Sequence, residues 1–490
     1  MGRRTLGRRR FLRAASSASL GALAGLLAGR SRPARAQQGR PPNILWLMTD
    51  DLRADGLSCY GQPWAKTPNL DALAQEGVRF EVAVVQSVIC VPSRTSMLAS
   101  RYCHTLGTMG MGKPAEGQPE APELPPPLLD AFGRRGYHLV NIGKCHAYRQ
   151  AWDINTGNPP ASRAPKPKLT DRDGPAYPTV RVPNRPWIIG GTVDVHPDDS
   201  RPARYVDAAL EYLENAREPW LLRVSFHEPH VPIQVPRTFM IDPDAVTLPL
   251  PTEEELAGKP RWETEYLSQY AGSLPLSRDE LQIARGTYYG VTSLVDHHIG
   301  RLLDHLRESG QAESTIILFT SDHGLQMGEH GLHKKRNFYE QTVCVPLLLR
   351  FGEGLPGGRV VRRPVELQDV LPTVMELAGM PTPEGIHGRS MVRLVRGTER
   401  NWRRAVFSEI DHAQSMYDCL RKDSGRRVMV RTRRRKLIYF KDERAMGPEG
   451  ALYDLDKDPG ETRNLYGRRE YAEVQRRLAG MVDRWDERTS

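Results

Sequence analysis

From residue 42 onward, short apolar runs alternate with stretches of helical periodicity, and this alternation constrains the fold more than any other feature. The clearest strand-like runs lie at 43–48, 137–142, 220–226 and 315–320. Helical spacing of apolar residues marks 69–76, which ends at Gly77, and a longer segment at about 285–308. Strands that alternate with helices are typical of an α/β domain in which helices flank a sheet. The sequence therefore predicts a large α/β domain.

The pattern changes after about residue 390, where short strand-like runs follow one another. They lie at 405–410, 427–432, 436–440 and 451–455. The last segment, from Tyr471 to Trp485, has the apolar spacing of an amphipathic helix. Strands closed by one helix predict a smaller C-terminal α+β subdomain with an antiparallel sheet and a terminal helix. We therefore divide the chain into a leader at 1–36, the α/β domain at 41–390 and the subdomain at 391–490.

The leader accounts for most of the positive charge of the chain. The formal net charge is +10, but residues 1–36 hold nine arginines and no acidic residue. The rest of the chain has 60 basic and 59 acidic residues. A nucleic-acid-binding protein is therefore not indicated.

The same leader has the parts of a secretory signal. An arginine-rich start precedes an apolar stretch from Ala14 to Ala28 and a small-x-small cleavage site at 34–36. Arg8-Arg9-Arg10-Phe11-Leu12 looks like the twin-arginine signal of bacterial export. A membrane anchor is the alternative, but the stretch is shorter than the roughly 20 residues that span a bilayer. We expect cleavage, a periplasmic or extracellular location and no stable membrane association afterwards.

Among the cysteines, Cys90 has the most informative neighbours. The six cysteines (59, 90, 103, 145, 344 and 419) lack the spacing of a zinc site, and the sequence selects no disulfide pair. Pro92 suits the first position of a helix, so Cys90 is expected just ahead of a helix N-terminus, where free N–H groups attract an anion. Arg94, one turn further on, can direct its guanidinium to the same place. A buried structural cysteine before an ordinary helix is the alternative.

Each of the strands in the α/β domain runs directly into ionisable residues. The strands are followed by Asp50-Asp51, by Gly143-Lys144-Cys145-His146, by His227-Glu228-Pro229-His230 and by Asp322-His323-Gly324. Ligands of open α/β sheets bind beyond the carboxyl ends of the strands, so these side chains are expected to form one site. Crowded carboxylates suit Ca²⁺ or Mg²⁺, while a histidine among them also fits Mn²⁺ or Zn²⁺. A carboxylate at 50 or 51 that caps a turn is the competing interpretation.

The segment Cys90-Val91-Pro92-Ser93-Arg94 resembles the Cys-x-Pro-x-Arg signature of the type I sulfatases, which have the alkaline-phosphatase-like fold. The resemblance continues through 43–45, 67–71, 143–146, 227–230, 322–331 and 452–455, and is nearest to the iduronate-2-sulfatase and choline-sulfatase type. It implies a large mixed sheet flanked by helices and hydrolysis of a sulfate ester to alcohol and sulfate. It also implies that a formylglycine-generating enzyme oxidises Cys90 to formylglycine, whose hydrated aldehyde is the nucleophile.

The resemblance also implies roles for the residues at the strand ends. Asp50, Asp51, Asp322 and His323 would bind one calcium ion together with residue 90, with Mg²⁺ or Mn²⁺ less favoured. The implied catalytic residues are Cys90, Arg94, Lys144, His146, His227 and Lys335. Of these, Arg94 and Lys144 would hold the formylglycine hydroxyls, His146 would accept a proton, and His227 and Lys335 would contact the sulfate. His230 and Lys334 remain alternatives to the last two, and Cys145 stands where sulfatases often carry an aromatic residue.

The substrate and the rival activities remain open at this point. A phosphonate monoester or phosphodiester hydrolase could share the site, and a transferase or an exported binding protein with a dead site are further alternatives. The sulfate ester, on a small molecule or a glycan, is not specified by any motif. Long aperiodic segments at 157–200 and 232–280 are expected over the active-site face. Asp296, His297 and His298 are expected on the solvated face of the long helix.

Overall fold

The computed structural model describes residues 40–111, 128–147, 152–157, 174–182, 187–266, 276–352, 354–411, 425–441 and 449–490. The predicted leader at 1–36 and Cys419 lie outside these ranges. No helix in the described part of the chain is long and apolar enough to cross a membrane.

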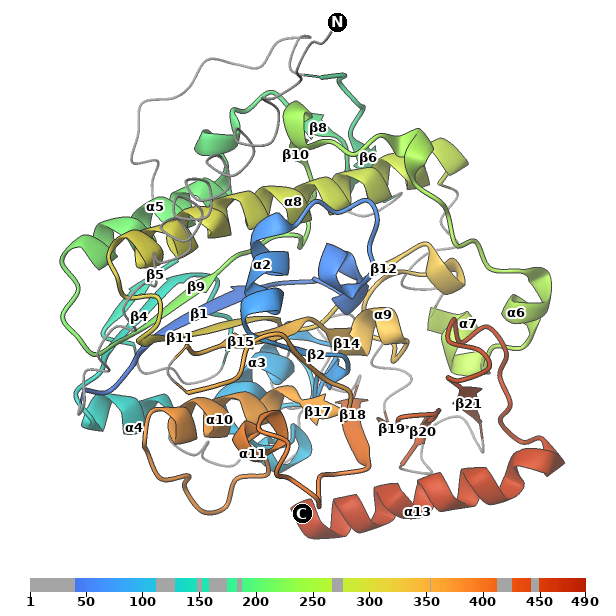
Figure 1. The fold of residues 1–490 in the computed structure, drawn as a ribbon. Coiled ribbons are helices and arrows are strands. Elements are labelled where there is room, and N and C mark those ends of the chain that lie inside the picture. Colours follow the sequence, from blue (N-terminus) through green and yellow to red (C-terminus); the bar gives the residue numbers. More distant parts are fainter. Residues whose placement is uncertain are drawn as a thin grey trace, which may run out of the picture. The chain divides into compact units, whose positions relative to one another are not determined.

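An eight-stranded mixed sheet forms the centre of the α/β domain (Figure 1). In spatial order its strands are β16 (Arg359–Val361), β2 (Val78–Phe80), β15 (Leu347–Arg350), β11 (Thr315–Ser321), β1 (Asn43–Thr49), β9 (Trp220–Ser225), β4 (His138–Gly143) and β5 (Ile154–Thr156). The strands β11, β1, β9 and β4 are parallel neighbours, whereas β15 pairs antiparallel with β11 and with β2. The predicted strands and the mixed sheet are confirmed, with strand ends within one residue of those expected.

Both faces of this sheet are covered by helices, so its strands are buried on both sides. One core contains Ile44, Trp46 and Met48 of β1, and it is covered by α3 (Cys90–Ala99), α4 (Leu129–Arg134) and α10 (Val370–Leu377). The other contains Leu45 and Leu47, beneath α2 (Pro68–Glu76), α5 (Arg201–Glu214) and α8 (Arg278–Glu308). A strand buried on both faces is apolar along its whole length, which explains why the sequence revealed β1.

The C-terminal part is a four-stranded antiparallel sheet with one long helix against it. Its strands in order are β18 (Ala405–Asp411), β19 (Arg426–Thr432), β20 (Arg435–Phe440) and β21 (Gly450–Asp454). The helix α13 (Ala472–Thr489) buries Leu478, Val482 and Trp485 in a core shared with this sheet. The predicted α+β arrangement is therefore confirmed.

Shorter elements complete the described fold. The strands are β3 (Ala83–Val84), β6 (Val180–Arg181), β7 (Ile188–Gly190), β8 (Thr192–Val193), β10 (Val235–Pro236), β12 (Gln326–Met327), β13 (His333–Lys334), β14 (Cys344–Val345) and β17 (Val365–Glu366). The helices are α6 (Glu253–Ala257), α7 (Arg261–Tyr266), α9 (Glu340–Val343) and α11 (Val392–Val395).

The long helix α8 differs from the prediction in two ways. It begins at Arg278, because Ser277 and Glu280 form a reciprocal capping box at its start. The expectation that 296–298 face solvent is wrong for Asp296 and His298, which are buried. Asp296 accepts hydrogen bonds from the backbone N–H groups of Asn69 and Leu70 in the first turn of α2. These side chains are buried because α8 packs against both α2 and α5.

Candidate active site

The carboxyl ends of β11, β1, β9 and β4 meet at one edge of the sheet, since these strands are parallel and adjacent. Their last residues are in register: Thr49 pairs with Ser321, and Ser225 pairs with both Met48 and Gly143. The first ionisable residue follows within two positions of each of these ends. The structure thus brings the groups from all these strand ends together.

Backbone conformations that are rare elsewhere shape this edge. A Cβ atom on Gly143 (φ +94°) would lie 2.1 Å from the carbonyl oxygen of Ser225, so only glycine fits at the end of β4. Asp51 (φ +67°) and His146 (φ +44°) adopt left-handed conformations although they are not glycines. Such residues cost about 1–3 kcal/mol each and concentrate at functional sites.

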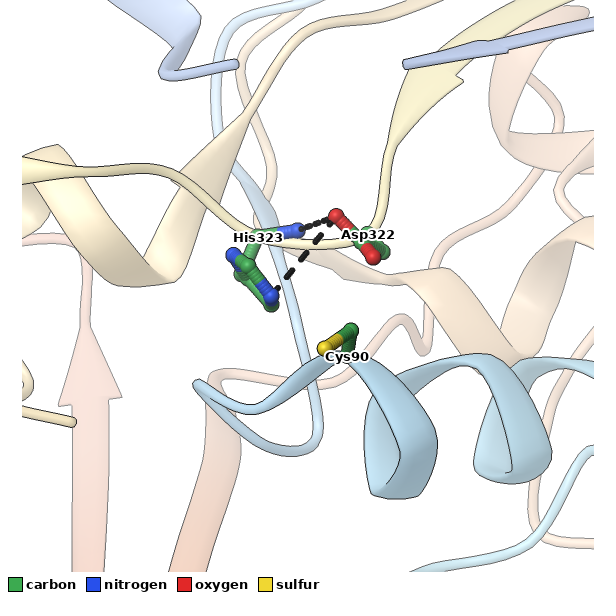
Figure 2. Close-up of side chains that lie close together, drawn as sticks. All are labelled: Cys90, Asp322 and His323. Carbon is green, nitrogen blue, oxygen red and sulfur yellow. Dashed lines mark hydrogen bonds and ion pairs between the residues drawn. The ribbon is translucent and has the colours of Figure 1, made fainter. Parts of the chain in front are cut away.

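A cluster of buried carboxylates lies at the centre. Asp50, Asp51 and Asp322 are fully buried, and ligand atoms of Asp50, Asp51 and His323 lie within 4.8 Å of one another. Cys90, Asp322 and His323 form a second, overlapping group of this kind, and Figure 2 shows the Cys90 thiol at the start of its helix beside the other two. Among the described residues, Asp50 Oδ1 and Asp51 Oδ2 accept no hydrogen bond although both atoms are buried. Crowded oxygens of this kind are suited to a divalent cation.

Cations from three segments neutralise part of this negative charge. Arg94 donates from Nε to Asp322 Oδ2 at 2.6 Å and from Nη2 to Asp50 Oδ2 at 3.0 Å. Lys144 Nζ lies 2.5 Å from Asp50 Oδ2, and Lys335 Nζ lies 2.9 Å from Asp51 Oδ1. Burial alone would raise the pKa of Asp50, but Lys144 and the other cations around it hold that pKa well below its ordinary value. The Asp50 carboxylate is therefore ionised at neutral pH.

Cys90 is the first residue of α3, and its thiol faces these charged groups. The helix begins two residues earlier than the sequence predicted, so Pro92 occupies its third position. Lys335 Nζ lies 3.8 Å from Cys90 Sγ, and the ligand atoms of Cys90, Asp322 and His323 lie within 4.8 Å of one another. Burial raises the pKa of the thiol, but the Lys335 charge and the neighbouring His146 and His323 side chains bring it well below its ordinary value. Residue 90 is therefore an activated position rather than an inert core cysteine.

The two candidate histidines beyond β9 lie close together. The rings of His227 and His230 are 4.8 Å apart between centroids, and each has a nitrogen within hydrogen-bond distance of the Val231 carbonyl oxygen. Burial and the charges of Arg201 and Lys144 lower the pKa of His227, whereas the charges that act most strongly on His230 are those of Asp51 and Asp50. Burial lowers the pKa of His230 to about 4, so its ring is neutral. Both histidines border the carboxylate cluster.

The two adjacent lysines have different surroundings. Lys335 points into the cluster, as described above. Lys334 Nζ instead lies 4.6 Å from the ring centroid of Trp187, and burial lowers the pKa of this lysine to about 7. Trp187 belongs to the segment at 157–200, so this part of the segment lies beside the site; 158–173 and 183–186 lie outside the described residues. The sequence analysis missed Trp187 because no periodic pattern surrounds it.

Comparison with known proteins identifies the family. The Sulfatase family model matches residues 42–380, and the C-terminal model of N-sulphoglucosamine sulphohydrolase matches 328–488. An N-acetylglucosamine-6-O-sulfatase of Bacteroides thetaiotaomicron is 27% identical, over 93% of this chain and 88% of the relative. A choline-sulfatase of Rhizobium meliloti is 28% identical, over 86% and 82%.

A solved structure extends the likeness to the fold. The phosphonate monoester hydrolase of Silicibacter pomeroyi superposes with a TM-score of 0.74 at 25% identity, covering 92% of this chain and 96% of that one. The sulfatase model alone spans more than half of the present sequence. The chain belongs to the sulfatase family and is a sulfuric ester hydrolase with the alkaline-phosphatase-like fold.

Proposed function

We propose that this protein is an exported sulfatase whose nucleophile is a formylglycine formed from Cys90. The observation that carries the proposal is the position of Cys90 in the first turn of α3, with Lys335 Nζ 3.8 Å from its sulfur and a ring nitrogen of His323 within 4.8 Å of it. A formylglycine-generating enzyme would supply the modification. Once hydrated, the aldehyde supplies two hydroxyl groups on one carbon, one for attack and one for release of the product.

The cation that the family implies fits the residues present. Asp50, Asp51, Asp322, His323 and residue 90 would hold one calcium ion, because two of the buried carboxylate oxygens, Asp50 Oδ1 and Asp51 Oδ2, accept no hydrogen bond within the described residues. Mostly oxygen ligands favour Ca²⁺, or less strongly Mg²⁺ or Mn²⁺. The ion when bound supplies positive charge against the oxygens of a sulfate group.

The catalytic contributions of this chain follow from charge and position. Lys335 places an ammonium group 3.8 Å from the sulfur of residue 90, and Lys144 places one beside Asp50. Both would lower the repulsion between a nucleophile and the anionic sulfate ester. Arg94 fixes Asp50 and Asp322 through two ion pairs. His146 lies near residue 90 and would accept a proton there, while His227 would assist the leaving oxygen.

The substrate is proposed to be a sulfate ester on a sugar or a small organic molecule. The names of two relatives, an N-acetylglucosamine-6-O-sulfatase and a choline-sulfatase, support both kinds. A phosphonate monoester or phosphodiester hydrolase is the second candidate. The solved phosphonate monoester hydrolase has a similar fold, and the match covers most of both chains.

The proposed location is the periplasm or the outside of a bacterial cell. The support is the signal-like composition of residues 1–36, with arginines before an apolar stretch. Replacing Arg8 and Arg9 by lysine should retain the protein inside the cell if the twin-arginine route is used. Appearance of both forms outside the cell at equal levels would exclude that route.

One experiment tests the reaction directly. Protein produced together with a formylglycine-generating enzyme is supplied with a 6-O-sulfated sugar, choline sulfate, an aryl sulfate, a phosphonate monoester and a phosphodiester. We expect kcat/KM to be highest for a sulfate ester, and mass spectrometry to find the aldehyde in the peptide that contains residue 90. Faster turnover of the phosphonate would favour the second candidate. An unmodified cysteine in fully active protein would exclude the proposed nucleophile.

A further inference from the structure

A cavity of about 400 Å³ lies at the end of α3 that is remote from Cys90. Tyr102, which follows the helix, forms part of its wall, and the backbone N–H of Tyr102 donates to His387 Nδ1 at 3.2 Å. The other walls come from the start of β18 and from the last two turns of α13, near the point marked C in Figure 1. Since α3 has ten residues, this cavity is separated from Cys90 by about 15 Å of helix.

The floor of the cavity is aromatic. Phe407 and Trp485 are stacked with centroids 4.7 Å apart, and Tyr102 meets the edge of Trp485 at 5.0 Å. All three side chains are largely buried. Because Nδ1 of His387 accepts a hydrogen bond from Tyr102, its other nitrogen, Nε2, carries the proton and is a donor in the cavity wall. Burial lowers the pKa of His387 to about 4, so this ring stays neutral.

Arginines surround this floor, and they differ in whether an acidic side chain pairs with them. Arg403 is bound to Glu366 and Asp369, so its charge is matched. The remaining arginines that line the cavity are Arg389, Arg404, Arg484 and Arg488. Each is exposed, and no ion pair joins any of them to an acidic group in the part of the chain that the structure describes. These four residues form an arginine rim, and their positive charges surround the aromatic floor.

The chemistry of the ligand follows from this combination. Guanidinium groups bind planar or tetrahedral oxyanions through paired N–H donors. A cavity of this volume matches those that hold small organic molecules, about 300–1,000 Å³. A bare sulfate ion, only a few times larger than the roughly 30 Å³ share of a water molecule, would leave most of it unfilled. The ligand therefore needs several anionic groups on an organic framework that fills more of the cavity than a single ion does.

We propose that the arginine rim and its aromatic floor bind a saccharide that carries sulfate groups, at a site separate from the catalytic one. The choice of sulfate as the anionic group rests on the proposed function, since a sulfated glycan would then meet both sites. A chain held at the rim would stay bound to the enzyme while a sulfate ester elsewhere on it reaches residue 90. The site is expected to contribute to binding of long substrates and not to the turnover of small ones.

The test compares two double variants on one helix. Arg484→Gln with Arg488→Gln removes two charges from the rim, while Arg476→Gln with Arg477→Gln removes two exposed charges of α13 that do not line the cavity. Binding of a sulfated hexasaccharide, its desulfated form, inorganic sulfate and a single-stranded oligonucleotide is measured by calorimetry. The protein carries Cys90→Ala throughout, so that no ligand is consumed. Turnover of an aryl sulfate by the same doubles with Cys90 intact is measured separately.

We expect the rim variant to bind the sulfated hexasaccharide about tenfold to a hundredfold more weakly, while the control variant binds as the parent does. The desulfated form should not bind, and aryl sulfate turnover should be equal in both doubles. Equal weakening in both doubles would overturn the proposal, because attraction would then come from the helix as a whole. Equally tight binding of the oligonucleotide, or binding of inorganic sulfate alone, would overturn the assignment to a sulfated saccharide. Failure of the proposed function would appear instead as absence of sulfate ester turnover, which these binding measurements do not require.

Discussion

The arginines at the two ends of α3 differ in burial and in pairing. At the Cys90 end, Arg94 is completely buried and its guanidinium is bound to Asp50 and Asp322. At the other end, the arginine rim is exposed and has no acidic partner among the described residues. A buried charge must be paired, because leaving one unpaired costs several kcal/mol, whereas an exposed guanidinium is already solvated.

This difference predicts how each end responds to change. Replacing a carboxylate, lysine or arginine of the buried cluster alters the balance of charge on its neighbours, so both catalysis and stability should respond. Replacing an exposed arginine leaves the remaining structure almost unaffected, so only ligand binding should respond. The predictions below run from the largest effect on turnover to the smallest.

The largest effect is expected from Cys90→Ala. Without a nucleophile at this position, turnover should fall by about a million-fold, to the level that binding and charge alone provide. Alanine is a good helix residue and fills almost the same space, so the melting temperature should change little. Steady-state kinetics and thermal unfolding measured on the same preparation check both statements. Substantial turnover by a pure Cys90→Ala sample would show that residue 90 is not the nucleophile.

Loss of a carboxylate should come next. Asp50→Asn or Asp322→Asn should weaken calcium binding and lower kcat by a factor of about 10² or more, since a ligand and a charge are removed together. Chelation of the parent protein should abolish turnover, and added calcium should restore it. The exposed Asp304→Asn on α8 serves as a control for the loss of one negative charge. Full activity of an Asp50→Asn, Asp51→Asn double variant would exclude the proposed metal site.

The neighbouring pairs of residues give the third comparison. We expect His227→Ala and Lys335→Ala to lower kcat by about 10²–10⁴-fold, the usual worth of acid–base assistance, and His230→Ala and Lys334→Ala to lower it much less. Lys335 lies 2.9 Å from Asp51, whereas Lys334 lies over Trp187. The decrease in kcat caused by His227→Ala should be smaller for a nitrophenyl sulfate, because its leaving group needs little protonation. Equal losses at both histidines for good and poor leaving groups would mean that His227 is not the acid.

The comparison of the two ends also explains what could be predicted from the sequence. The strands β1, β4, β9 and β11 were found because apolar residues predominate in each of them. Neighbouring parallel strands bring the residues that follow them to one edge of the sheet. The ionisable residues that follow these strands could therefore be expected to lie together. The resemblance to sulfatases added their expected roles, which the strand ends alone do not give.

Other features could not be found in this way. The burial of Asp296 depends on the packing of α8 against α2, and its polar side chain gave no sign of that contact. The cavity at the arginine rim is assembled from Tyr102, from 387–389, from 403–407 and from 481–489. These pieces are far apart in the chain and share no motif, so only the fold brings them together. Of the two histidines beyond β9, the sequence favours His227 because it comes directly off the strand, and the choice between it and His230 stays a prediction.

The smallest effect on turnover is expected at a buried ion pair that lies outside the catalytic cluster. Glu329 Oε1 accepts from Arg53 at 2.7 Å and from Arg285 at 2.6 Å, and all three side chains are buried. Burial would raise the pKa of Glu329, but the two arginines hold it well below its ordinary value of 4.5. A carboxylate with a depressed pKa stabilises the folded state fully above its unfolded value and loses that contribution as pH falls below about 4.5.

Glu329→Gln should therefore lower the free energy of unfolding at pH 7 by about 3–5 kcal/mol, because two buried arginines lose their shared partner. It should leave kcat on an aryl sulfate within about twofold at a temperature where the variant is folded. Urea unfolding between pH 7 and pH 3 checks the sign: the parent should lose stability more steeply on acidification than the variant, so the two curves converge. The exposed Glu308→Gln on α8 is the matched control and should run parallel to the parent. If the Glu329→Gln curve also stays parallel to the parent's, the ion pair does not stabilise the fold through its charge.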